Sequence, residues 1–215
     1  MKGRGPVVRL DRSAKARMIE KVLQDFRGVE IANLKTLDIG CGNGGISCYF
    51  AQRNEHASVD IVDQRKPPFE NYTFALTSDE ILPFEDDSFD VVISNHVIEH
   101  VTDHLKHLSE IRRVLAPGGS VYLATPNKSS PIMEGHIGND MVLRYRQMTP
   151  LFQKAGFQAR EYGLRVAAEP VRFNGEVAWA KHIPKTVLKL MRPLFPSHIF
   201  VLTDMGAAAD QVKAA

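Results

Sequence analysis

The sequence predicts an α/β fold in which a mostly parallel β-sheet is covered by helices on both faces. Segments of strand length alternate with helical segments, and the connections between them are short. The strand segments are apolar throughout, which is typical of strands that are buried on both faces of a sheet. The chain has 215 residues, of which 44% are hydrophobic, and this is enough for one domain, 1–215, with a sizeable core.

The individual elements are placed by their hydrophobic period and by Pro and Gly residues. Apolar residues at helical spacing predict the first helix, and Pro117-Gly118-Gly119 ends a later one. Strands are expected at 34–39, 57–62, 72–76, 89–94, 120–125, 157–166 and 198–203. Helices are expected at 11–27, 46–54, 104–115, 149–155 and 183–192. The other segments are a loose arm at 1–10, a substrate-side loop at 128–147, a segment at 167–197 that holds an accessory helix, and a frayed tail at 205–215.

The composition argues against several classes of protein. The formal net charge of +2 is too small to indicate a nucleic-acid-binding surface by itself. Cys41 and Cys48 lack the spacing of metal ligands, so we interpret them as reduced thiols of a cytoplasmic protein. No apolar run approaches the roughly 18 residues of a membrane span, and the basic N-terminus lacks the apolar core of a signal peptide.

A glycine-rich stretch, 36–45, joins the first predicted strand to a helix. Asp38 lies in the strand, and four of the six residues from Gly40 to Gly45 are glycine. Glycines let the backbone turn tightly and let a ligand approach it closely, and the following helix offers unpaired N–H groups. The stretch therefore predicts a site for a nucleotide-like cofactor at the carboxyl end of the first strand.

A dinucleotide is the first candidate for this cofactor. Gly40, Gly42 and Gly45 satisfy G-x-G-x-x-G, and Asp63 follows at about the distance expected of an acid that binds a ribose. However, Asp38 is badly placed for a pyrophosphate and better suited to a cationic ligand. In addition, no tyrosine has a lysine four residues later, as a short-chain dehydrogenase would require.

Four motifs resemble those of class I S-adenosylmethionine-dependent methyltransferases. They are Leu37-Asp38-Ile39-Gly40-Cys41-Gly42-Asn43-Gly44, Leu82-Pro83-Phe84-Glu85-Asp86-Asp87-Ser88-Phe89-Asp90, Val97-Ile98-Glu99-His100-Val101 and Arg113-Val114-Leu115-Ala116-Pro117-Gly118-Gly119. The resemblance implies a Rossmann-like three-layer sandwich with a seven-stranded sheet whose last strand is antiparallel. It also implies S-adenosylmethionine as the cofactor and methyl transfer as the reaction.

The resemblance also implies roles for individual residues. The glycines would line the amino-acid part of the cofactor, Asp38 would attract its ammonium group, and Asp63 would accept the ribose hydroxyls, with Asp60 as the rival. The family often has an acid at the position of Ser78, and Asp79 follows one residue later. The expected cofactor-binding residues are Asp38, Gly40, Cys41, Gly42, Gly44, Asp63, Asp79, Ile81, Leu82 and Asn95.

His96 and His100 are the candidate catalytic residues because they follow the fourth strand, near the expected cofactor. A histidine can remove a proton from a hydroxyl acceptor near neutral pH. The alternative is that either histidine only packs or hydrogen-bonds locally. The strand end Ser94-Asn95-His96 lacks the carboxylate cluster of a magnesium site, so no metal is expected. It also lacks the Pro-Pro-aromatic sequence of enzymes that methylate DNA bases, so no DNA substrate is expected.

The acceptor is expected to be a small molecule or a lipid-like molecule, methylated at oxygen. Candidate substrate-binding residues are Asn127, Glu134, His136 and Arg144, and the alternative is a solvated surface loop. The amphipathic run 183–192 fits a lid, a weak membrane-surface contact or an accessory helix packed on the sheet. Other hypotheses are a protein or RNA methyltransferase, an inactive cofactor-binding protein and a nicotinamide enzyme.

Overall fold

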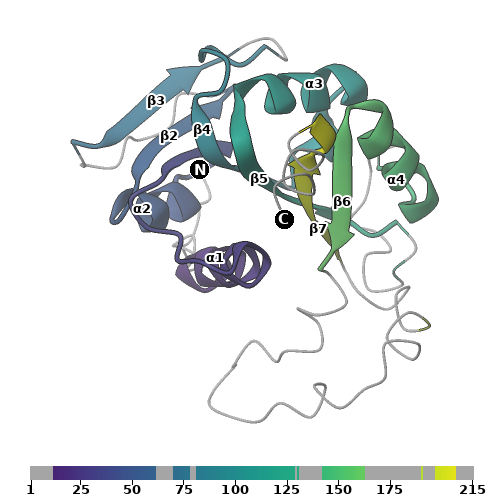
Figure 1. Ribbon diagram of the computed structural model, residues 1–215, viewed down its shortest axis with the longest axis horizontal. Helices are drawn as coiled ribbons and strands as arrows, with labels where there is room; N and C mark the ends of the chain where they lie inside the picture. Colours follow the sequence, from purple (N-terminus) through teal and green to yellow (C-terminus); the bar gives the residue numbers. More distant parts are fainter. Residues whose placement is uncertain are drawn as a thin grey trace, which may run out of the picture.

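The computed structural model contains one mixed β-sheet of seven strands in the order β3-β2-β1-β4-β5-β7-β6 (Figure 1). Strand β7 runs antiparallel to both of its neighbours, and the pairs among the first five strands are parallel. This confirms the predicted α/β, Rossmann-like fold with an antiparallel last strand. The structure describes residues 12–61, 70–77, 81–128, 130, 142–162, 190 and 197–206.

The elements have the following bounds. The strands are β1 (Lys35–Ile39), β2 (Glu55–Asp60), β3 (Tyr72–Leu76), β4 (Phe89–Asn95), β5 (Leu115–Pro126), β6 (Phe157–Glu161) and β7 (Ser197–Asp204). The helices are α1 (Ser13–Arg27), α2 (Gly45–Ala51), α3 (His104–Val114) and α4 (Tyr145–Lys154), with a 3-10 turn η1 (Ile98–His100).

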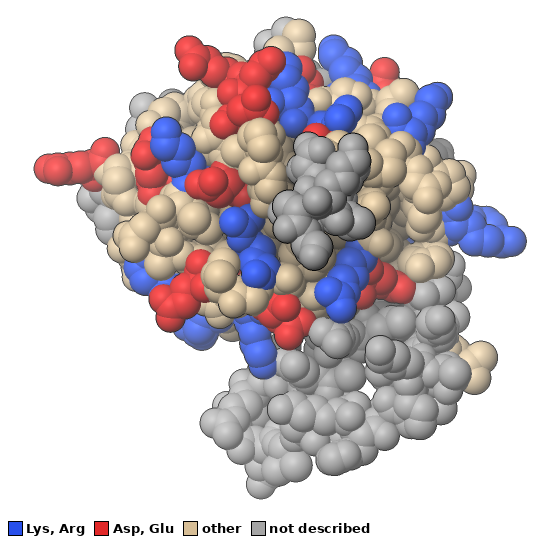
Figure 2. Space-filling view, viewed as in Figure 1, with Lys and Arg blue, Asp and Glu red and all other residues tan. Residues whose placement is uncertain are grey.

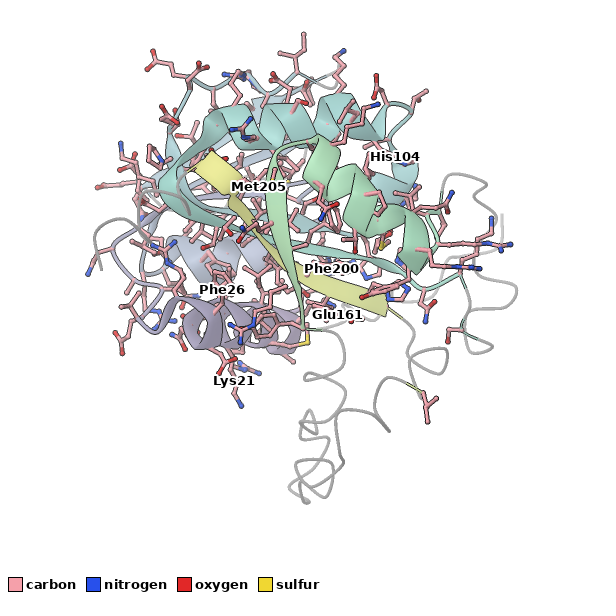
Figure 3. All side chains as sticks on the ribbon, turned by 45° about the vertical axis from the view of Figure 1, so that its right-hand side comes forward. Lys21, Phe26, His104, Glu161, Phe200 and Met205 are labelled. Carbon is pink, nitrogen blue, oxygen red and sulfur yellow. The ribbon has the colours of Figure 1, made fainter. Side chains whose placement is uncertain are left out.

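Two hydrophobic cores lie on opposite faces of the sheet. Helices α1 and α2 cover one face, where Ile19 of α1 packs with Ile93 of β4. Helices α3 and α4 cover the other, where Phe152 of α4 packs with Val92 of β4. Figure 3 shows the same layers, with Phe26 of α1 and His104 of α3 on opposite sides of the sheet. Both faces of the central strands β1, β4 and β5 are buried, which explains why these strands are mostly apolar, whereas the edge strands β3 and β6 carry exposed residues.

The structure corrects the predicted start of two elements. Strand β5 begins at Leu115, five residues before the predicted 120–125, because Leu115 pairs with Phe89 and a register shift absorbs the glycines that follow. Helix α4 begins at Tyr145, so 145–147 are not part of a substrate-side loop as predicted. Thr149-Pro150 has the local pattern of a helix start. Packing overrides it, because the Tyr145 ring stacks on Phe200 at 6.1 Å and draws the chain onto the sheet a turn earlier.

Helix α2 ends at Ala51, although the sequence predicted that it would reach residue 54. The Asn54 side chain explains the early end. Its amide nitrogen donates to the carbonyl oxygen of Phe50 at 3.0 Å, and its amide oxygen accepts from the Leu34 N–H at 3.2 Å. These bonds turn the chain into β2, which therefore starts at Glu55 instead of residue 57.

The surface of the described residues carries both signs of charge. Acidic and basic side chains are interspersed over the face shown in Figure 2, without a field of one sign. None of the described helices combines the length and apolar character needed to cross a membrane. The predicted arm at 1–10 and the predicted helix at 183–192, except Leu190, lie outside the described residues.

Candidate functional site

The carboxyl ends of β1 and β4 lie side by side at one edge of the sheet. The two strands pair directly, with Ile39 beside Ser94. From β1 the chain continues to β2 and β3 on one side, and from β4 it continues to β5 on the other. This reversal of strand order is the topological switch point, where ligands bind in open α/β sheets.

The glycine turn after β1 has a left-handed backbone at three positions. The φ angles of Gly40, Gly42 and Gly44 are 67°, 55° and 72°, values that favour glycine. A Cβ on Gly40 would lie 2.6 Å from a Val97 methyl carbon, so this glycine is required by the packing of the protein itself. A Cβ on Gly42 would meet no atom of the described residues within 4 Å. The space beside Gly42 is therefore available to a ligand.

Asp38 lies beneath this turn and is 1% exposed. Its carboxylate accepts a hydrogen bond of 2.7 Å from the Ser47 hydroxyl of α2. Burial raises the pKa of Asp38 to about 7, while the Ser47 hydrogen bond and the charge of Arg12 oppose the increase. A cationic ligand near the turn would favour the ionised carboxylate, as the predicted role of Asp38 requires.

The raised pKa of Asp38 predicts that Asp38→Asn stabilises the free protein in a pH-dependent way. A carboxyl group with a raised native pKa favours folding at low pH, and this contribution is lost as the pH rises from about 4 to about 7. Relative to wild type, the variant should gain little near pH 4 and about 4 kcal/mol above pH 7, since each unit of the pKa difference corresponds to about 1.4 kcal/mol. Urea unfolding from pH 4 to pH 8 measures the difference, with Ser47→Ala as the control for the lost hydrogen bond. If the free energies of unfolding of the variant and the wild type differ by the same amount at every pH, the raised pKa of Asp38 is contradicted.

Asp60 ends β2 and is committed to the backbone of the turn. Its carboxylate accepts from the Gly42 N–H at 2.8 Å and from the Ile61 N–H at 2.7 Å. Asp60 therefore holds the turn and lies at the carboxyl end of β2, whereas Asp63 lies outside the described residues, so the choice between the two for the ribose stays a prediction. The neighbouring Cys41 is buried, and burial raises the pKa of its thiol to about 12. The thiol stays protonated and is a packing group instead of a nucleophile.

Exposed apolar side chains lie at or just beyond the ends of β2 and β3. Ile61, Leu76 and Ile81 are 73%, 59% and 54% exposed, and the Thr77 hydroxyl donates to the Ile81 carbonyl oxygen at 3.1 Å. Leu82 is 5% exposed and packs in the core. Ile81 and Leu82 were both predicted to contact the cofactor. Of these two, Ile81 exposes side-chain surface that a cofactor could contact, and Leu82 does not. Asp79 lies outside the described residues.

His96 follows β4 and takes part in a polar cluster that joins four elements. Its Nδ1 lies 3.2 Å from Glu99 Oε1 in η1, and its Nε2 lies 3.4 Å from Ser197 Oγ in β7. Glu99 is 3% exposed and also accepts from the Thr125 hydroxyl of β5 at 3.3 Å. The residues Glu99, Thr125 and Ser197 had no predicted role: Glu99 lies in a recognised motif three residues after His96, and Thr125 and Ser197 are distant from His96 in the chain.

The remaining predicted residues divide into two groups. Asn95 and Asn127 are buried at the ends of β4 and β5, and Asn95 Oδ1 has no hydrogen-bond partner among the described residues. His100 is exposed at the end of η1, and Arg144 is exposed at the start of α4, where its N–H donates to the Gln147 side chain. The structure thus brings His96, Asn95 and Asn127 to one edge of the sheet. Glu134 and His136 lie outside the described residues.

No metal site is found in the part of the chain that the structure describes. That part contains no group of three or more His, Cys, Asp or Glu side chains placed to hold a metal ion. The described residues at this edge include a glycine turn, a buried carboxyl group and an imidazole paired with a second carboxylate.

Comparison with known proteins gives a consistent result. Residues 37–123 match a family profile described as a methyltransferase domain. The chain is 32% identical to a probable S-adenosylmethionine-dependent methyltransferase of Mycolicibacterium smegmatis over 70% of this chain and 64% of that protein. It is 32% identical to the chloroplastic tocopherol O-methyltransferase of Arabidopsis thaliana over 53% of this chain and 37% of that protein. It thus spans less than two thirds of either relative.

A solved structure has the same fold. The S-adenosylmethionine-dependent methyltransferase of Aquifex aeolicus superposes with a TM-score of 0.59 and covers 90% of this chain and 93% of its own. Its sequence is 16% identical, so this comparison supports the fold alone.

Proposed function

Because the chain carries a class I S-adenosylmethionine-dependent methyltransferase domain, we propose that it methylates a small-molecule or lipid-like acceptor at an oxygen atom. The observation that carries this proposal is the turn at Gly40–Gly44 above the buried Asp38, next to His96 at the end of the adjacent strand. The products would be the methylated acceptor and S-adenosylhomocysteine.

The described residues fit S-adenosylmethionine. The open space beside Gly42 leaves room for the amino-acid part of the cofactor, and Asp38 is placed to attract an ammonium group. The exposed side chains of Ile61, Leu76 and Ile81 offer an apolar surface to an adenine ring. When bound, the cofactor supplies an electrophilic methyl group on a positively charged sulfur.

The protein's part in the reaction is to position the acceptor, exclude water and remove a proton. A hydroxyl becomes a good nucleophile when its proton is taken, and a positioned imidazole can take it. His96 is the best-placed base because Glu99 holds its ring at Nδ1 near the switch point and its Nε2 faces a hydroxyl, that of Ser197. Alignment with the methyl group would supply the rest of the rate enhancement.

Two observations support a small or lipid-like acceptor bearing oxygen. One relative is a tocopherol O-methyltransferase, although this chain covers 37% of that protein. The interspersed charges of the visible face do not form the basic stripe expected of an RNA-binding surface (Figure 2).

Calorimetry with S-adenosylhomocysteine and with NAD tests the cofactor assignment. We expect saturable binding of S-adenosylhomocysteine and no heat of binding from NAD. At a concentration 100 times its dissociation constant, the bound product should stabilise the fold by about 2.7 kcal/mol.

The acceptor class is then tested with methyl-labelled S-adenosylmethionine and a panel of phenols, alcohols, lipid extracts, peptides and RNA. Label in peptide or RNA alone would contradict the proposed acceptor, and binding of NAD alone would contradict the methyltransferase function.

A further inference from the structure

We propose that Glu99 is a positioning residue, which keeps the His96 proton on Nδ1 and leaves the lone pair of Nε2 to accept the proton of an acceptor hydroxyl that takes the place of the Ser197 hydroxyl. This inference rests on the proposed function and specifies the chemistry of the same site. It assigns a role to Glu99, Thr125 and Ser197, none of which was expected from the sequence.

The pairing of Glu99 with His96 determines the tautomer. An ionised carboxylate only accepts hydrogen bonds, so Nδ1, at 3.2 Å from Glu99 Oε1, must be the donor. In a neutral imidazole the other nitrogen, Nε2, is then an acceptor. The hydroxyl of Thr125 donates to Glu99 Oε2 at 3.3 Å and thereby directs the other carboxylate oxygen toward His96. Glu99 is buried, so water competes little for these bonds.

The backbone of His96 adds independent evidence that its position is functional. Its φ angle is 59°, a left-handed value that is uncommon for a residue other than glycine. Such a conformation costs about 1–3 kcal/mol and persists only where the surroundings impose it. Here the His96 N–H donates to the Ala124 carbonyl oxygen at 2.9 Å, and the ring is held by Glu99. The strain turns the imidazole toward the edge of the sheet where β7 begins.

Ser197 indicates what His96 Nε2 can bind. Its hydroxyl lies 3.4 Å from Nε2, which is the relation that an acceptor hydroxyl would have to the base. With the oxygen acceptor of the proposed function, the acceptor group belongs to the O–H class, that is, an alcohol, a phenol or an enol. The acceptor oxygen forms the new bond to the methyl carbon while its proton passes to Nε2. The electron pair of the broken carbon–sulfur bond stays on sulfur, and the imidazolium formed is stabilised by Glu99 until it releases the proton to water.

Nitrogen NMR of histidine-labelled protein with S-adenosylhomocysteine tests the proposal without requiring the acceptor. The ring signals of His96 are assigned with His96→Asn. We expect the wild type to carry the neutral-state proton on Nδ1 and Glu99→Met to lose this preference. Glu99→Gln should keep it, because the amide oxygen can still accept from Nδ1–H. A wild-type His96 with its proton on Nε2, or an unchanged tautomer in Glu99→Met, would overturn the proposal.

Measurements of kcat and KM distinguish a positioning role of Glu99 from a purely structural one. With the acceptor identified by the labelling panel, Glu99→Gln should lower kcat about 100-fold and leave KM within about 3-fold, since it loses the charge that stabilises the imidazolium. Glu20→Gln is the matched control, because Glu20 is also a buried carboxylate but bonds to Tyr49 and Arg53 between α1 and α2. An equal loss of kcat in both variants would refute the role of Glu99. Failure of S-adenosylhomocysteine to bind the wild type would instead refute the proposed function.

Discussion

Gly42→Ala is expected to weaken S-adenosylhomocysteine binding at least 100-fold while the protein remains folded. Gly42 has a φ of 55°, and a Cβ there meets no atom within 4 Å in the described part of the chain, so the methyl group would project into the space offered to the cofactor. The backbone strain of alanine in this conformation should cost about 1–2 kcal/mol of stability. Calorimetry measures the affinity, and urea unfolding measures the stability.

Gly28→Ala is the matched control for this prediction. Gly28 ends α1 with a φ of 71°, and a Cβ there also meets none of the described atoms within 4 Å. The two variants should therefore lose similar stability, while only Gly42→Ala loses affinity. Equal affinities would show that the space beside Gly42 is not the cofactor site. Gly40→Ala is less informative, because its Cβ would lie 2.6 Å from Val97 and disturb the fold itself.

His96→Asn is expected to lower kcat by about 100- to 10,000-fold, the range for loss of a general base. Asparagine tolerates the left-handed backbone that His96 adopts, so the variant removes the imidazole with little change in backbone strain. The affinity for S-adenosylhomocysteine should stay within about 3-fold, because the proposed cofactor contacts are at the glycine turn. Methyl-transfer assays over a range of acceptor concentrations, together with calorimetry, measure both quantities.

His100→Asn distinguishes the two histidines that the sequence proposed as bases. His100 is exposed at the end of η1, whereas the His96 ring contacts Glu99 and Ser197. We expect His100→Asn to change kcat less than 3-fold. A larger loss in His100→Asn than in His96→Asn would move the base to His100 and would contradict the assignment made here.

The sequence predicted the fold well because its evidence for the sheet is local. Apolar runs, the glycine turn and prolines placed the strands, and β3 at Tyr72–Leu76 agrees with its predicted bounds. The predicted bounds were wrong where contact with a residue far along the chain determines where a strand or helix begins. Leu115 joins β5 because it pairs with Phe89, and α4 starts at Tyr145 because that ring stacks on Phe200. A pattern of neighbouring residues carries no information about which distant residues will pack against them.

The site was predicted less completely, for the same reason. Gly40, Gly42 and Asp38 were proposed as cofactor-binding residues because they lie together in a motif that resembles a known family, and this role stays a prediction. His96 was proposed from its position after a strand, but its partner Ser197 is 101 residues away along the chain. Glu99 lay inside a recognised motif, yet its contact with Thr125 depends on the pairing of β4 with β5.

The sequence by itself predicted most of the strands and the position of the glycine turn, because these depend on residues that are neighbours in the chain, and the resemblance of its four motifs indicated the kind of cofactor. Only the tertiary structure decided that Asp60 holds the turn, that Asp38 is buried enough for its pKa to rise, and that His96 is held by Glu99. Burial and the pairing of side chains depend on which segments the folded sheet brings together, and these are properties of the whole chain.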